Sequence, residues 1–216
     1  FLARHPLKLA IGDRRKKRIL TRTSSADRFA LVYLTLAVVF FTIAIASLPR
    51  QFLWPFVIAS PLVFIQFLYD ARGHSRKLTP EVAGALAVGS ISTAIALAGG
   101  WSWPTALALW IIVACRHVPT ILYLRVVLDR RRKKQRPTVN AGVIAVQLLP
   151  LIAVYLLLFF EIAPAVSIIV FAILFVRAIV GLFNRAELTP KKLGISEIAF
   201  GTFAVLLVGV GYRFGW

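Results

Sequence analysis

The sequence predicts an all-α fold of the polytopic transmembrane type, a helix bundle with seven spans in this chain. Hydrophobic residues make up 59% of the 216 residues and charged residues 16%, whereas a soluble domain averages about 45–50% apolar and about 25% charged residues. The mean hydropathy is +0.82. Several windows of 18 or more residues are apolar and almost free of charge, which is typical of transmembrane helices.

Seven such windows follow one another along the chain. Each would be about 27–33 Å long at 1.5 Å per residue, close to the thickness of a bilayer core. The first 28 residues carry nine Lys or Arg and no long apolar region, so they are not a secretory signal peptide. The expected spans are Phe29–Leu48, Phe52–Tyr69, Val82–Gly99, Trp103–Tyr123, Ala141–Phe160, Ile162–Phe183 and Ile195–Tyr212.

The formal net charge of +18 predicts the orientation of the spans. If the spans alternate, all Lys and Arg residues except Arg50 and Arg213 lie on one side, many of them in connections such as 125–136. Cytoplasmic connections carry such an excess, so we expect residue 1 in the cytoplasm, Trp216 outside, and a multi-pass protein of the cell inner (plasma) membrane. Because these cations lie between spans, we expect no nucleic-acid partner. The opposite connections are very short and predict antiparallel helix hairpins. Near this predicted outer boundary lie Trp54, Trp101, Trp103 and Trp216, where an aromatic belt is expected.

Two segments indicate an internal repeat, with copies of approximately 1–112 and 113–216. "ARHPLKLAIGDRRKKR" from Ala3 and "CRHVPTILYLRVVLDRRRKK" from Cys115 share Arg-His, a proline, apolar residues, Asp and a basic run. The tripeptide at 78–80 recurs at 188–190 with nearly the same separation. Most of a span precedes the second Arg-His pair, so the repeat predicts that a span also precedes the first pair. We therefore expect that two N-terminal helices are missing from this chain and that the full protein has nine helices.

Four segments carry a resemblance to a known family. "FLARHPLKLAIGDRRKKR", "FLYDARGHSRKLTPEVAGALA", "RHVPTILYLR" and "LGISEIAFG" together resemble the YwiC-like family of bacterial integral membrane proteins. That family has no established activity, so the resemblance implies a membrane fold rather than a reaction.

A looser similarity is to the UbiA superfamily of intramembrane prenyltransferases. The resemblance implies nine helices in two four-helix repeats plus one, with two Asp-rich motifs where the Arg-His segments would fall. The N-D-x-x-D-x-x-x-D pattern is absent, and each segment offers one acid, Asp13 or Asp129. Because binding a diphosphate through magnesium needs clustered carboxylates, the catalytic residues are not carried over and no catalytic or metal-ligating residue is predicted.

A set of polar residues near the predicted cytoplasmic ends is the candidate site for an anion or a lipid headgroup. A charge within a span usually faces protein or water, and Arg binds phosphate and carboxylate through paired donors. Two Arg-His pairs from the two repeats would face one cytoplasmic cavity, unless the side chains serve only for snorkelling and interhelical hydrogen bonds. The candidates are Arg4, His5, Arg116, His117, Arg125 and Asp70. His5 and His117 are also the weak alternative for a b-type haem, and no other cofactor is expected.

The segment "FLYDARGHSRKLTPE" is interpreted as a polar hinge between two spans. Gly73 permits the turn, Thr79 would cap the next helix, and Glu81 favours the positive end of its dipole. Asp70 ends the preceding span and is expected to pair with Arg72 or Arg116. Cys115 is interpreted as a small packing residue.

Three functions follow as alternatives. The leading hypothesis is a noncatalytic membrane component that binds lipid, isoprenoid or quinone, contacts anionic lipid through its basic runs, and packs against other subunits of a membrane complex. The second is a diverged UbiA-like prenyltransferase acting on a phosphorylated isoprenoid. The third is a small-molecule transporter.

Overall fold

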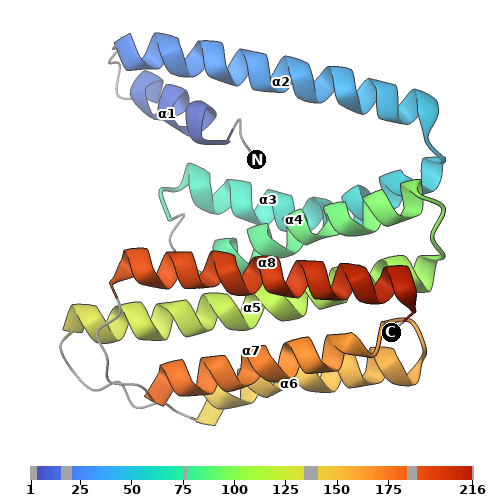
Figure 1. Ribbon diagram of the computed structural model, residues 1–216. Helices are drawn as coiled ribbons and strands as arrows, with labels where there is room; N and C mark the ends of the chain where they lie inside the picture. Colours follow the sequence, from blue (N-terminus) through green and yellow to red (C-terminus); the bar gives the residue numbers. More distant parts are fainter. Residues whose placement is uncertain (1–3, 16–20, 75–76, 134–140, 184–188, 216) are drawn as a thin grey trace. The chain divides into compact units, whose positions relative to one another are not determined.

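The computed structural model describes residues 4–15, 21–74, 77–133, 141–183 and 189–215, and this part of the chain contains helices and no strands. The chain divides into two compact units, an N-terminal unit, Phe1–Gln51, and a C-terminal unit, Phe52–Trp216. The elements are α1 (Arg4–Arg15), α2 (Thr21–Ser47), a short 3-10 helix η1 (Arg50–Leu53), α3 (Trp54–Ala71), α4 (Leu78–Ala98), α5 (Trp103–Lys133), α6 (Ala141–Phe159), α7 (Val166–Phe183) and α8 (Pro190–Phe214) (Figure 1).

Seven of these helices, α2 to α8, are long and apolar enough to cross a membrane, as predicted. Helix α5 is longer than expected, because the basic run assigned to a connection continues the helix to Lys133. Its 31 residues span about 46 Å, against about 30 Å of hydrocarbon. Lys and Arg are good helix formers, so a helix that leaves the bilayer does not end at the first charges. Trp216, Leu188 and the segment 1–3 lie outside the described residues.

In the N-terminal unit, α1 packs against α2. The buried carboxylate of Asp13 accepts a hydrogen bond of 2.9 Å from the hydroxyl of Thr23. An exposed ion pair joins Arg14 and Asp27 at 2.9 Å. Asp13, the single acid of the first Arg-His segment, therefore links α1 to α2.

In the C-terminal unit, consecutive helices alternate in direction (Figure 1). Helix α3 packs on α4 and α4 on α5, while α5 to α8 share one apolar core. The short connections at 100–102 and Glu161 join α4 to α5 and α6 to α7, and the helices of each pair are in contact, as predicted for antiparallel hairpins. Large apolar side chains such as Ile95, Phe159 and Ile198 are exposed, as expected of a surface that faces lipid. The core residues are Ala108, Ile112, Val154, Leu157, Val170, Phe171, Ala204 and Val208.

Helices α4 and α5 pack closely because small residues lie between them. A Cβ added at Gly89 would lie 3.1 Å from the indole of Trp110, so a larger residue would require that side chain to shift. Two interhelical hydrogen bonds join the pair, from Trp110 Nε1 to Leu86 O at 2.8 Å and from Thr93 Oγ1 to Ala106 O at 2.9 Å. In lipid such packing and hydrogen bonding replace the hydrophobic drive that water supplies.

The α3–α4 connection is the polar turn that the sequence predicts. Gly73 has φ +75°, a conformation that favours glycine. The cap of α4 differs from the expectation, because the helix begins at Leu78 and the extended Lys77 is its N-cap. The hydroxyl of Thr79 therefore lies within the first turn. At the matching tripeptide, Thr189 is the N-cap of α8 and accepts a hydrogen bond from the backbone N–H of Lys192 at 3.3 Å.

Candidate functional site

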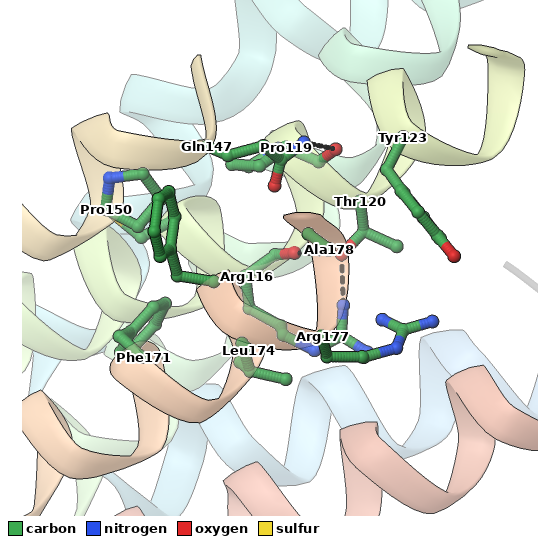
Figure 2. A pocket seen from close by; sticks show the side chains of 12 residues that line it. Arg116, Pro119, Thr120, Tyr123, Gln147, Pro150, Phe171, Leu174, Arg177 and Ala178 are labelled. Atoms are coloured by element: carbon green, nitrogen blue, oxygen red, sulfur yellow. Dashed lines mark hydrogen bonds between the residues drawn. The ribbon is translucent and has the colours of Figure 1, made fainter. Parts of the chain in front are cut away.

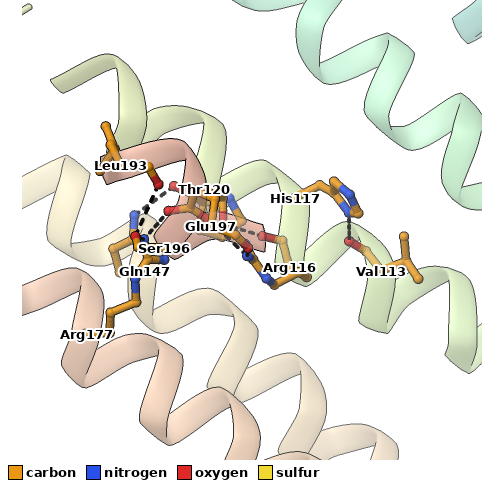
Figure 3. A network of polar contacts seen from close by, with 10 residues as sticks. Val113, Arg116, His117, Thr120, Gln147, Arg177, Leu193, Ser196 and Glu197 are labelled. Carbon is orange, nitrogen blue, oxygen red and sulfur yellow. Dashed lines mark hydrogen bonds and ion pairs between the residues drawn. The ribbon is translucent and has the colours of Figure 1, made fainter. Parts of the chain in front are cut away.

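Three charged side chains meet inside the C-terminal unit (Figure 3). Arg116 of α5 pairs with Glu197 of α8, with 3.0 Å between Nη2 and Oε2. Arg177 of α7 pairs with the other carboxylate oxygen of Glu197. The three side chains are only 14%, 13% and 14% exposed for Arg116, Arg177 and Glu197. One carboxylate is thus held by two guanidinium groups from two different helices, and we call these residues the Arg–Glu–Arg cluster.

The cluster lies within the candidate membrane spans of α5, α7 and α8. Arg177 and Glu197 lie in α7 and α8, each about 10 Å along the helix from the end beside the α7–α8 connection. That end of the unit also carries the α3–α4 and α5–α6 connections, and we call it the basic end. A lone charge inside hydrocarbon costs about 2.5–3.5 kcal/mol on insertion scales, and pairing with an opposite charge lowers that cost.

Polar groups of all four helices surround the cluster. Arg116 donates through Nη1 to the hydroxyl of Thr120, one turn further along α5. Arg177 donates to the hydroxyl of Ser196 at 3.4 Å. From α6, the buried Gln147 donates through Nε2 to the carbonyl oxygen of Pro119 at 2.9 Å. Pro119 has no N–H, so the carbonyl oxygen of Cys115, four residues earlier, lacks its helical donor in this turn of α5.

Aromatic rings hold the guanidinium of Arg177 from α5 and α8. Its Cζ lies 5.1 Å from the ring centroid of Tyr123 and 4.7 Å from that of Phe200. Cation–π contacts of this kind reach about 2 kcal/mol where water is excluded. Arg177 is therefore positioned by two rings as well as by Glu197.

A small cavity of about 20 Å³ opens beside the cluster (Figure 2). Arg116 and Arg177 line it together with Pro119, Gln147 and Pro150. A cavity of this size accommodates about one water molecule. The Nε atom of Arg116 is buried and has no hydrogen-bond partner among the described residues.

An apolar groove adjoins the cluster between α7 and α8. Ile173, Ala199, Phe200 and Phe203 line it, and its volume is about 320 Å³. Phe200 belongs both to the groove and to the cation–π contact with Arg177. The polar cluster and the apolar groove are therefore neighbours across one phenyl ring.

Of the residues proposed from the sequence, Arg116 lies in the cluster, paired with Glu197. His117 is exposed and points away from it, with Nδ1 hydrogen-bonded at 2.7 Å to the carbonyl of Val113 in the same helix (Figure 3). Arg125 forms an ion pair of 2.9 Å with Glu81 of α4.

The remaining candidates are not brought to the cluster by any described contact. Asp70 lies in the last turn of α3, where its carbonyl oxygen accepts a hydrogen bond from the backbone N–H of Gly73. Arg4 and His5 begin α1 in the N-terminal unit, and their side chains lie outside the described part. Asp129 is exposed on α5. Among the described residues no group of three or more His, Cys, Asp or Glu is placed to hold a metal ion.

Arg177 and Glu197 are functional candidates that the sequence prediction missed. Both lie in predicted spans, and Glu197 is the one acid in the segment "LGISEIAFG". Intramembrane residues of opposite charge usually pair with one another. That rule, applied to Arg116, Arg177 and Glu197, is the signal that would have identified the cluster.

A family model for YwiC-like proteins matches residues 1–96. The matched part comprises the N-terminal unit, α3 and most of α4, so the Arg–Glu–Arg cluster lies beyond it. No curated protein and no solved structure matches the chain.

Proposed function

We propose that this chain, whose residues 1–96 match the model of YwiC-like proteins and whose described part has seven candidate spans, binds the anionic headgroup of a membrane phospholipid without catalysing a reaction. One observation carries the proposal: two largely buried arginines share one carboxylate beside an apolar groove. Binding of this kind suits a component that contacts lipid and packs against other membrane subunits.

The charge of the cluster supports an anionic ligand. Arg116 and Arg177 carry two positive charges and Glu197 one negative charge, so the Arg–Glu–Arg cluster has a net charge of +1. Arg binds phosphate through two parallel N–H donors, and such charge-assisted bonds are about twice as strong as neutral ones. The two arginines therefore favour an anion as the ligand.

The groove between α7 and α8 supports a ligand with a hydrocarbon tail. Its four lining side chains are all apolar, and its volume of about 320 Å³ lies at the lower end of the range for ligand pockets. Because Phe200 separates the groove from Arg177, a phospholipid would place its headgroup at the guanidinium and an acyl chain against Ile173 and Phe203.

Lipid retention in the native protein and in an Arg177→Gln variant tests the proposal. Purification in mild detergent followed by native mass spectrometry should show a bound anionic phospholipid. Removing hydrogen bonds to a charged group costs about 1.5–3 kcal/mol, so retention of added phosphatidic acid should fall about tenfold or more in Arg177→Gln.

Arg213→Gln is the matched control, because it removes one positive charge from the exposed opposite end of α8. It should bind phosphatidic acid as the native chain does, and phosphatidylcholine should bind weakly to all three proteins. Equal retention of phosphatidic acid by Arg177→Gln and the native chain would show that the cluster is not the headgroup site.

Transport of a small molecule is a second candidate, favoured by the ion pairs buried among α5, α7 and α8. Ionisable residues inside a bundle often line the path of a transported substrate. Flux across proteoliposomes that is lost in Arg177→Gln would support transport, whereas tight lipid binding without flux would support the lipid-binding function.

A further inference from the structure

We propose that the Glu197 carboxylate is an internal occupant of the anion site, and that a phosphate monoester binds by taking its place. This inference rests on the proposed function and concerns the regulation of the same site. In the observed state the site is closed, because the protein's own carboxylate lies between the two arginines.

The cluster as it stands has no room for a phosphate group. The adjoining cavity is about 20 Å³, the space of about one water molecule. Both guanidinium groups already contact Glu197, which uses both of its carboxylate oxygens. An anion can therefore reach the two arginines together only when Glu197 moves away.

Exchange of one anion for another avoids a large electrostatic cost. Arg116 and Arg177 are both nearly buried, and removing the partner of a buried charge is strongly destabilising. If a phosphate enters as Glu197 leaves, the two guanidinium groups keep an opposite charge between them throughout. Glu197 thus stabilises the two arginines when no ligand is bound, and the ligand takes the place of Glu197 when it binds.

The unpaired donor of Arg116 indicates what kind of anion fits. Nε and Nη2 form one fork of the guanidinium, and Glu197 accepts from Nη2 while Nε has no partner among the described residues. A phosphate monoester has three terminal oxygens, one more than a carboxylate. It can accept from both atoms of the fork and from Arg177, so it satisfies a donor that Glu197 leaves unpaired.

The test is the affinity of Glu197→Gln for phosphate monoesters in nanodiscs. The substitution keeps the shape of the side chain and removes the competing charge. If Glu197 occupies the site about nine-tenths of the time, its removal should raise the apparent affinity for phosphatidic acid about tenfold. Glu161→Gln, which removes a carboxylate from the exposed α6–α7 connection, should leave the affinity unchanged.

A parallel titration with inorganic phosphate identifies the source of the anion. Tighter binding in either titration supports the exchange: a gain with phosphatidic acid alone identifies a lipid headgroup, and an equal gain with inorganic phosphate identifies a free anion. If Glu197→Gln does not fold, Glu197→Asp withdraws the carboxylate by one methylene and should show a smaller gain. Unchanged or weaker binding in the variant that folds overturns the exchange, even where Arg177→Gln still loses lipid and the proposed function holds.

Discussion

At the scale of single residues, Glu161 adopts a conformation that favours glycine. Three helices end with the same pattern of backbone hydrogen bonds, and the residue with positive φ is Gly73 after α3, Gly100 after α4 and Glu161 after α6. The φ angle of Glu161 is 56°, and a left-handed conformation costs a residue with a Cβ about 1–2 kcal/mol. The α6–α7 connection therefore contains local backbone strain.

Glu161→Gly should relieve this strain. We expect the free energy of unfolding to rise by about 0.5–1 kcal/mol, because glycine adopts positive φ without a steric penalty but gains freedom in the unfolded chain. Thermal unfolding in detergent measures the change. Gly100→Ala provides the opposite substitution at the equivalent position and should lower the stability; a destabilised Glu161→Gly would contradict the argument.

At the scale of helices, Gly181 lets α7 approach α5 closely enough to position the cluster. A Cβ at Gly181 would overlap the hydroxyl of Tyr123, whose side chain is buried. The ring of Tyr123 in turn faces the guanidinium of Arg177, one turn before Gly181 on α7. The spacing of the two helices thus determines where Arg177 lies.

Gly181→Ala should destabilise the bundle and weaken lipid binding together. Forcing extra volume into a packed interface costs about 1–3 kcal/mol, and displacement of Tyr123 removes a ring from Arg177. Unfolding in detergent and retention of phosphatidic acid measure the two effects. Gly209→Ala is the matched control on α8, because a Cβ there meets no atom within 4 Å, and it should be neutral or slightly stabilising. Equal behaviour of both variants would contradict the packing argument.

At the scale of the whole molecule, the described residues contain seven candidate spans, and if consecutive spans alternate in direction the basic connections lie on one side. The excess of Lys and Arg predicts that this side is cytoplasmic. The α4–α5 connection would then face outward, and the α3–α4 connection inward.

Single-cysteine labelling tests this orientation cleanly, because Cys115 is the one cysteine of the chain. In a Cys115→Ala background, Ser102→Cys and His74→Cys place a thiol at exposed positions of opposite connections. A membrane-impermeant maleimide should label Ser102→Cys in intact cells and His74→Cys only after lysis. The reverse labelling pattern would contradict the predicted orientation and place the α3–α4 connection outside.

The amino-acid sequence by itself determined the seven long apolar helices but not α1, because the transfer of 18 or more apolar residues into hydrocarbon depends on local composition and little on partners. The glycine turn at Gly73 was likewise readable from a few neighbouring residues, whereas the cap expected at Thr79 was wrong, because α4 begins at Leu78 and Lys77 is its N-cap. Tertiary structure alone decided that Glu197 lies between Arg116 and Arg177, since those residues are far apart along the chain and meet only when α5, α7 and α8 pack together. It also showed that His117, adjacent to Arg116, faces away from the cluster, because successive residues of a helix point in different directions.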